Sequence, residues 1–268
     1  MKLPPLTVRY SDLNTDHLHV TDYEDNKYTP SQKAGFVTYK GQSLQIQSPD
    51  LLLFTYGIPK EDPKYHKTDK DRLYLKIPED VNNPKCIEFF KKMESIDAYF
   101  GSDEFKTSKM GRSAKYYKYI PIVRSVIVED DDEADEVEDK RKEKNAKPRY
   151  IKVKIDNDYE TSNVLTKCFV KDGNERIQVA DIVTVDDLMK YVRYNSHVRV
   201  LISVVRTYMS ENKLGNSEYK NNGVAIKLNQ VLCDPRPIQI HARNDRCNII
   251  ESDEDNRNIV SCILNQYI

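Results

Sequence analysis

The chain has no tryptophan, and its 8 glycines among 268 residues form no glycine-rich phosphate-binding loop. No apolar run approaches the roughly 20 residues that a membrane-spanning helix requires. The first residues, MKLPPLTVRYSD, lack the apolar stretch of a secretory signal peptide. These absences argue against P-loop chemistry, and they predict a protein without membrane contact.

Patterns that bind metals or carry catalysis are also missing. The 5 cysteines are scattered and form no CxxC pair, which is typical of buried thiols in a reducing compartment. Cys233, His241 and Cys247 could supply three metal ligands, but their spacing matches no strong zinc pattern. The carboxylates lie in charge runs, where a solvated surface is the usual explanation. We therefore expect no catalytic residues, no metal and no cofactor, and we do not expect an enzyme.

Charge is nearly balanced overall but strongly segregated along the chain. The 42 basic residues face 43 acidic ones, yet residues 129–139 (EDDDEADEVED) hold nine acids and residues 251–255 hold four. Without these two segments, 30 acids remain against 42 bases, so the rest of the chain carries about +12. Such a pattern suits a polyanion binder that screens itself, and equally a protein whose acidic loops only aid solubility.

Hydrophobic periodicity predicts a β-rich α+β fold. Short strands follow each other through residues 35–47, 71–80, 117–124 and 150–156, and a hairpin is expected around the turn at 171–174. Residues 84–101 and 184–194 are expected as two helices, and a long hairpin should occupy residues 198–233. We divide the chain into an N-terminal arm (1–34), a domain (35–235) with a mobile acidic and basic loop at 129–148, and a tail (236–268).

Tyrosine is interleaved with lysine and arginine in several predicted strands. Single-stranded nucleic acid requires cations for its phosphates and flat rings for its exposed bases. The alternative is that the tyrosines pack in the core and the lysines only protect sheet edges. The candidate nucleic-acid-binding residues are Lys109, Arg112, Lys115, Tyr117, Lys118, Tyr119, Arg124, Tyr150, Lys152, Lys154, Arg206, Tyr208 and Lys227.

The order of these elements resembles the single-stranded DNA-binding proteins of large nucleocytoplasmic DNA viruses and T7-like phages. The segments that carry the resemblance are IQSPDLLLFTYGIP, DRLYLKIPED with the helix IEFFKKMESIDAYFG, YKYIPIVR, PRYIKVKID, TKCFVKDGN and the hairpin at 198–233. The resemblance implies an elaborated OB-type antiparallel barrel with two short helices, closed by the last hairpin. Because tryptophan is absent, base stacking would fall to tyrosine or phenylalanine.

We therefore expect a non-catalytic, sequence-tolerant single-stranded DNA-binding protein that supports viral DNA replication, recombination or repair. Its expected partners are single-stranded DNA, viral replication proteins and further copies of itself. Its expected place is the replication site in the cytoplasm or nucleus of an infected cell, or the virion. The alternative is a structural or assembly protein of the virion, whose charged segments meet other proteins.

Overall fold

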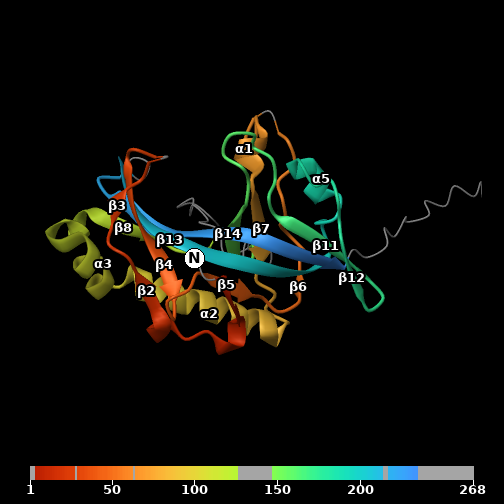
Figure 1. Ribbon diagram of the computed structural model, residues 1–268, viewed down its shortest axis with the longest axis horizontal. Helices are drawn as coiled ribbons and strands as arrows, with labels where there is room; N and C mark the ends of the chain where they lie inside the picture. The colour runs from red at the N-terminus through yellow and green to blue at the C-terminus, as the bar shows by residue number, and fades with distance from the viewer. Residues whose placement is uncertain (1–3, 28, 63, 126–146, 214–216, 235–268) are drawn as a thin grey trace, which may run out of the picture. The chain divides into compact units, whose positions relative to one another are not determined.

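The computed structural model describes residues 4–27, 29–62, 64–125, 147–213 and 217–234 (Figure 1). They form a mixed α+β fold that is rich in strands, with a curled half-barrel sheet and few helices. The acidic segment 129–139 and the tail 236–268 lie outside the described residues, as does the loop 129–148 apart from its last two residues. No helix in the described part is both long and apolar enough to cross a membrane.

Two long antiparallel strands, β13 (His197–Lys213) and β14 (Lys220–Asp234), run through the centre of the sheet and confirm the predicted hairpin. Their register shifts between Leu201 and Ile202, between Val204 and Arg206, and between Ser210 and Lys213. Bulges of this kind bend a strand and increase its twist. The register shifts therefore account for the curl of the sheet at the central hairpin.

Short strands line both outer edges of this hairpin. Three strands pair in succession with β13: β4 (Gln32–Tyr39), β5 (Leu44–Gln47) and β6 (Leu51–Leu52). Three others pair with β14: β8 (Tyr117–Ile120), β10 (Tyr150–Ile155) and β11 (Lys167–Asp172). The remaining strands extend these: β7 (Tyr74–Pro78) and β9 (Val123–Arg124) on β10, β12 (Glu175–Gln178) on β11, β1 (Leu6–Arg9) on β5, and β2 (Leu18–Val20) and β3 (Glu24–Asp25) on β4.

Two features of this sheet differ from the expected antiparallel barrel. The sheet is mixed, because β8, β10 and β11 run parallel to β14 and β1 runs parallel to β5. The expected arm at residues 1–34 also contributes β1, β2 and β3, and β4 passes through the expected boundary at residue 35. These first strands have only two to four residues, which is too short for a recognisable alternation.

The helix predicted at 84–101 is confirmed as α2 (Pro84–Gly101). The Asn83 side chain accepts hydrogen bonds from the backbone N–H groups of Lys85 and Cys86, and proline occupies the first turn, where it costs no helical hydrogen bond. The second predicted helix is shorter, α5 (Val185–Met189), and it begins with a capping box between Thr184 and Asp187.

Two further helices were not predicted: α1 (Asp69–Arg72) and α3 (Asp103–Met110). The Ser102 side chain caps α3 by accepting a hydrogen bond from the N–H of Phe105, and a 3-10 turn at Gly111–Tyr116 follows. Residues 103–116, between α2 and β8, are therefore helical. Their apolar signal is weak, because Phe105 and Met110 are the only residues of α3 that are buried.

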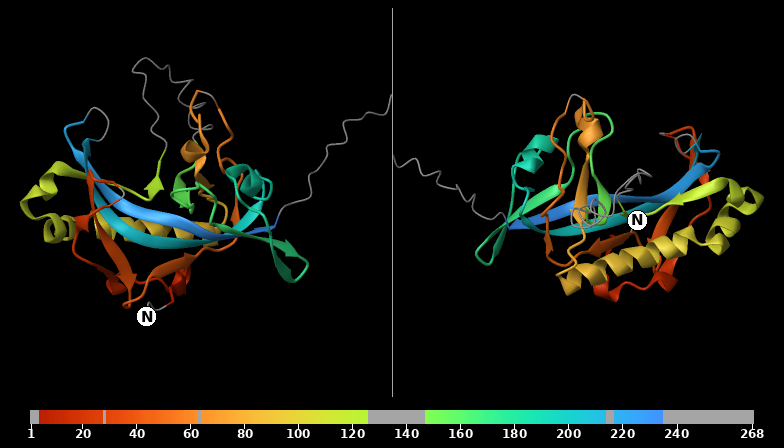
Figure 2. Two further views of the ribbon diagram at one scale, coloured as in Figure 1. Left: turned by 45° about the horizontal axis from the view of Figure 1, so that its top comes forward. Right: turned by 180° about the vertical axis from the view of Figure 1, so that it is seen from behind.

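The core is one cluster of buried side chains that includes residues of α2, β7, β10 and the central hairpin. Ile151, Val153 and Ile155 are fully buried there, which confirms the predicted alternation of β10. They pack in one cluster with Leu75 and Ile77 of β7 and with the buried phenylalanines of α2. α2 lies on one side of the long hairpin, and α1 and α5 lie on the other (Figures 1 and 2). The alternate residues of β7 and β10 therefore point away from the core.

A candidate nucleic-acid interface

The outward face of β7 and β10 carries an alternation of tyrosine and lysine. The antiparallel register sets Lys152 opposite Lys76 and Lys154 opposite Tyr74. Tyr150 lies opposite Arg124 of β9. Because directly opposed residues of neighbouring strands share a face, these side chains form one continuous surface.

Lysine ammonium groups lie against tyrosine rings on this surface. The Nζ of Lys152 is 3.8 Å from the ring centroid of Tyr74, and the Nζ of Lys76 is 4.8 Å from that of Tyr150. Lys76 also lies 5.5 Å from the Tyr56 ring. Each contact stabilises the cation by about 0.5–1 kcal/mol where solvent has access, and this attraction holds the side chains in place without neutralising them.

Positive charge is concentrated on this face of the sheet. Burial, and then the charges of Lys147 and Arg124, lowers the pKa of the Lys76 ammonium. Burial, and then Arg124 and Lys76, lowers the pKa of Lys152. Among the described residues no carboxylate forms an ion pair with Lys76 or Lys152, and like charges directly opposite each other in a sheet are destabilising. The free protein thus keeps a half-buried, mutually repelling lysine pair.

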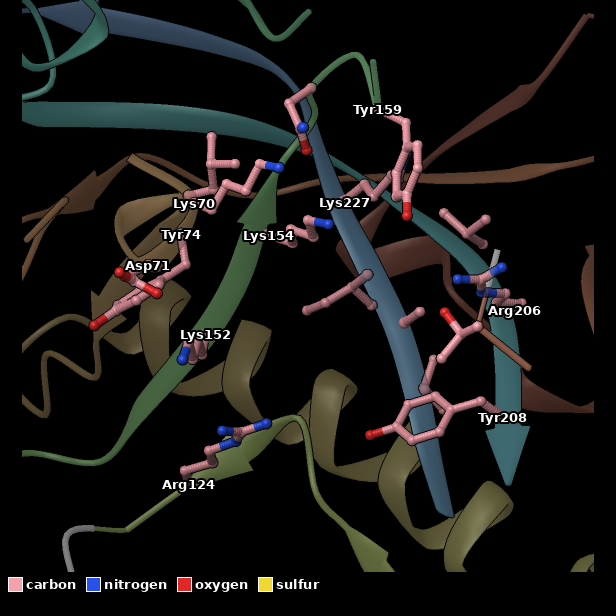
Figure 3. Close-up of a pocket in the computed structure, with 17 residues that line it drawn as sticks. Lys70, Asp71, Tyr74, Arg124, Lys152, Lys154, Tyr159, Arg206, Tyr208 and Lys227 are labelled. Atoms are coloured by element: carbon pink, nitrogen blue, oxygen red, sulfur yellow. The ribbon is translucent and has the colours of Figure 1, made fainter. Parts of the chain in front are cut away.

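This surface continues into a cavity of about 680 Å³, which we call the basic groove. Four of its cations come from neighbouring strands, with Lys152 and Lys154 on β10, Lys227 on β14 and Arg206 on β13 (Figure 3). Lys227 pairs with Asp156 at 2.5 Å. The other charged or aromatic side chains that line the groove are Lys70, Asp71, Tyr74, Arg124, Tyr159 and Tyr208.

A half-buried carboxylate on α2 positions the strand that carries Arg124. Asp97 accepts hydrogen bonds from the backbone N–H groups of Ile122 at 2.7 Å and Val123 at 3.0 Å, and from the Tyr119 hydroxyl at 2.9 Å. Burial raises the pKa of Asp97, while these donors oppose the shift. The carboxylate thereby ties the turn between β8 and β9 to α2, directly before Arg124.

Ion pairs fix the two other sides of the groove. At the start of β10, Arg149 binds both carboxylate oxygens of Glu79, at 2.7 and 2.8 Å, and also pairs with Glu94 of α2. The fully buried Arg72 joins Asp69 of α1 at 2.6 Å to Asp186 of α5 at 2.9 Å. One guanidinium nitrogen of Arg72 donates to both carboxylates, which ties α1 to α5 and holds α1 where Lys70 and Asp71 line the groove.

The structure divides the thirteen candidate residues into two regions. Seven belong to the groove or to the adjoining face of β10: Arg124, Tyr150, Lys152, Lys154, Arg206, Tyr208 and Lys227. The other six lie on what we call the α3–β8 surface, which covers residues 103–120: Lys109, Arg112, Lys115, Tyr117, Lys118 and Tyr119.

Tyr117 and Tyr119 were expected to present rings for base stacking, but the structure buries Tyr117 and packs the half-buried Tyr119 against the core. Tyr117 is 5% exposed and its hydroxyl donates to Glu211 at 2.8 Å. The ring of Tyr119 packs on α2 at Gly101, and burial beside Asp97 strongly raises the pKa of its hydroxyl. Lys109 is also engaged, because its ammonium donates to the carbonyl oxygen of Val20 at 2.9 Å.

Sequence reasoning missed several residues of the site. Tyr74 and Lys76 alternate with Leu73, Leu75 and Ile77, which is the same signal that identified Lys152 and Lys154 on β10. That alternation was sufficient to find them. Lys70 and Tyr159 had no such signal, because they lie in α1 and in the turn after β10, which only the fold brings to the groove.

Within the described ranges, no three His, Cys, Asp or Glu side chains are grouped so that they could hold a metal ion. Cys86, Cys168 and Cys233 are buried free thiols there. His241 and Cys247, the other two candidate metal ligands, lie outside the described residues. The chemistry that the described site offers is therefore that of cations and aromatic rings.

Comparison with known proteins yields a viral relative. No protein-family model matches the chain. The chain is 26% identical over 246 residues to "Uncharacterized protein R505" of Acanthamoeba polyphaga mimivirus. The match covers 82% of this chain and 59% of the relative, so the chain spans about three fifths of that protein's length. The relative indicates a virus-related protein, and its name states no activity.

Proposed function

We propose that the basic groove binds single-stranded nucleic acid without catalysis and with little sequence preference. The observation that carries the proposal is the half-buried Lys76–Lys152 pair, which the fold holds beside Arg124 and against tyrosine rings without a described carboxylate partner. Phosphates would neutralise these cations and remove their repulsion. Such a cluster is costly in the free protein and favourable in a complex with a polyanion.

The side chains of the groove suit a flexible strand whose bases are exposed. Lys152, Lys154 and Arg206 come from strands on both sides of β14, so they can follow a phosphate backbone across the sheet. Tyr74 and Tyr208 offer ring faces, and stacking tolerates any base because every base has a π-face. Affinity would therefore depend on salt and on length more than on sequence.

We further propose that the strand is DNA and that the protein acts in viral replication, recombination or repair, at the replication site of the infected cell. The viral relative supports a virus-related role. The long final hairpin after the short helix α5 supports an elaborated OB-type barrel as the scaffold. The second candidate function, a structural or assembly protein of the virion, draws equal support from the viral relative. It predicts no salt-dependent affinity for oligonucleotides.

The test is the affinity of the full chain for oligo(dT) and for duplex DNA across a salt series. We expect tighter binding to the single strand, with a log–log slope of about −0.7 per neutralised phosphate. Lys152→Met should remove about one phosphate contact, which costs about fivefold at 0.1 M salt from the same slope. The matched Lys118→Met, at the exposed position of β8, should bind like the wild type. No binding at low salt, or equal losses in the two variants, would refute the proposal.

A further inference from the structure

A second cavity, of about 550 Å³, adjoins the basic groove. Tyr74 and Lys76 of β7 line it on one side, the loop around Gly57 forms another, and residues at and after the end of α5 form a third. Tyr74 lines both cavities. A chain that lies along the groove past Lys152 would therefore reach the second cavity by passing over the Tyr74 ring.

This cavity differs from the groove in its chemistry. Ile58 and Val192 are buried in its wall, and the thioether of Met189 lies beside them. Tyrosine rings and cations surround this apolar part: Tyr56, Tyr74, Tyr194, Lys60, Lys76 and Arg193. Apolar walls with aromatic rings suit a flat, weakly polar ring, and cations around them suit an anion covalently linked to that ring. A nucleotide of a single strand has both parts.

We propose that the second cavity accepts a nucleobase of the strand that the basic groove binds, with Tyr194 closing over it. The inference rests on the proposed function and adds to it a particular base position. Two observations favour the bound strand as the occupant. The cavity and the groove share Tyr74 as a wall, and Lys76, which lies 5.9 Å from the Tyr74 ring centroid, stands where the backbone would pass from one to the other. Tyr194, which is 67% exposed, is free to move against a base.

Gly57 provides a way to fill this cavity without disturbing the fold. A Cβ atom added to Gly57 would meet no heavy atom within 4 Å. The main-chain contact of Gly57, whose carbonyl accepts from the N–H of Lys76 at 3.0 Å, does not involve a side chain. Gly57→Phe should therefore place a ring where we expect the base, and Gly57→Ala is the matched control that leaves the cavity open.

The experiment measures the affinity of the full-length wild type and both variants for oligo(dT) of about 16 nucleotides, the upper range for one OB-type site. A parallel set of oligonucleotides carries one abasic position, moved along the strand. In the wild type, we expect abasic substitution at one or two positions to cost clearly more than elsewhere. Gly57→Phe should weaken binding about 5- to 150-fold, which corresponds to the loss of one stacked base. In that variant the sensitive positions should disappear, and Gly57→Ala should behave as the wild type.

A second readout does not depend on Gly57. Because the chain has no tryptophan, Tyr194→Trp creates a single fluorescent reporter at the cavity. Its emission should change on binding oligo(dT), and should not change when the bound strand is abasic at the sensitive positions. Uniform abasic costs together with unchanged emission would overturn the inference while leaving the groove intact. A wild type that binds no oligonucleotide would instead refute the proposed function, so the two failures are distinguishable.

Discussion

The basic groove and the α3–β8 surface have similar compositions and opposite partner patterns. Both interleave tyrosine with lysine and arginine, and both were predicted from sequence as parts of one site. Lys152 of the groove lies opposite Lys76 of the adjoining second cavity, and neither forms an ion pair with a described carboxylate. On the α3–β8 surface, Lys106 pairs with Asp103 at 2.8 Å, and the Tyr117 hydroxyl donates to Glu211. The first arrangement leaves the charge of the lysine pair for a ligand, and in the second these two contacts lie within the fold, although Arg112 and Lys118 stay exposed.

The difference teaches that composition alone does not distinguish a binding surface from a structural one. A tyrosine beside lysines can hold two elements together, as Tyr119 does when it joins β8 to Asp97 of α2. It can equally hold a cation in place, as Tyr74 does with Lys152. The two cases differ in whether each polar group already has a partner, and that information appears only when distant segments meet.

Replacing one tyrosine of the α3–β8 surface and one of the second cavity, which adjoins the groove, should have the largest effect and should separate structural from binding residues. Tyr119→Ala removes a buried ring and leaves Asp97 without one of its donors, so it should lower the free energy of unfolding by about 3–5 kcal/mol. Tyr194→Ala, at an exposed position, should change it by less than about 0.5 kcal/mol and weaken oligonucleotide binding instead. Chemical denaturation and oligo(dT) titration measure the two quantities. If the Tyr119→Ala variant were as stable as the wild type but bound oligo(dT) poorly, Tyr119 would be a binding residue and not a structural one.

Sequence periodicity was sufficient for the elements whose two faces differ clearly. The alternation of β10, the apolar stripe of α2 and the central hairpin were predicted correctly, and with them Lys152, Lys154 and Arg206 of the groove. The parallel direction of β8, β10 and β11 could not be predicted, because strand direction leaves no trace in an alternation pattern. It decides which cations meet across β14.

For the α3–β8 surface, the sequence did not show where the side chains lie, and the reason is different. Tyr117 and Tyr119 share one face of β8, as their spacing requires, but spacing does not show which face meets the core. Lys115 lies in a 3-10 turn and therefore does not share the strand's alternation. Arg112 and Lys118 are exposed charges whose surroundings are set by α3, a helix with only two buried residues. Local pattern was too weak there to place the side chains.

A charge reversal at Lys152 should have an effect of intermediate size and should sharpen the comparison of the two regions. Lys152→Glu sets a carboxylate opposite Lys76 and near Arg124, so it should raise the free energy of unfolding by about 0.5–1 kcal/mol. The same change should weaken oligo(dT) binding by at least about fivefold at 0.1 M salt, since a phosphate contact is lost. Lys118→Glu on β8 should change neither the free energy of unfolding nor the affinity for oligo(dT). If Lys152→Glu destabilised the protein, Lys152 would be a structural residue and the groove would resemble the α3–β8 surface.

The smallest expected effect is a pH dependence confined to the groove. The pKa values of Lys76 and Lys152 are lowered in the folded protein, first by burial and then by neighbouring cations. Bound phosphate would raise them again, so binding takes up protons and affinity should fall as the pH rises from 7 to 9. The free energy of unfolding should change in the opposite direction. Between the lowered pKa of the folded protein and the unfolded value near 10.4, the unfolded chain binds more protons than the folded protein. The free energy of unfolding should therefore rise with pH in this range, because the penalty of burying a charged lysine is relieved.

The double variant Lys76→Arg with Lys152→Arg isolates these two lysines, because guanidinium groups stay charged throughout this range. Its affinity should be flatter with pH than that of the wild type, whatever its absolute value. The difference should remain below the about fivefold cost of losing one phosphate contact at 0.1 M salt. Titrations with oligo(dT) at constant ionic strength at pH 7, 8 and 9 measure both slopes. Equal slopes would mean that the proton uptake arises elsewhere and that Lys76 and Lys152 do not cause the pH dependence of binding.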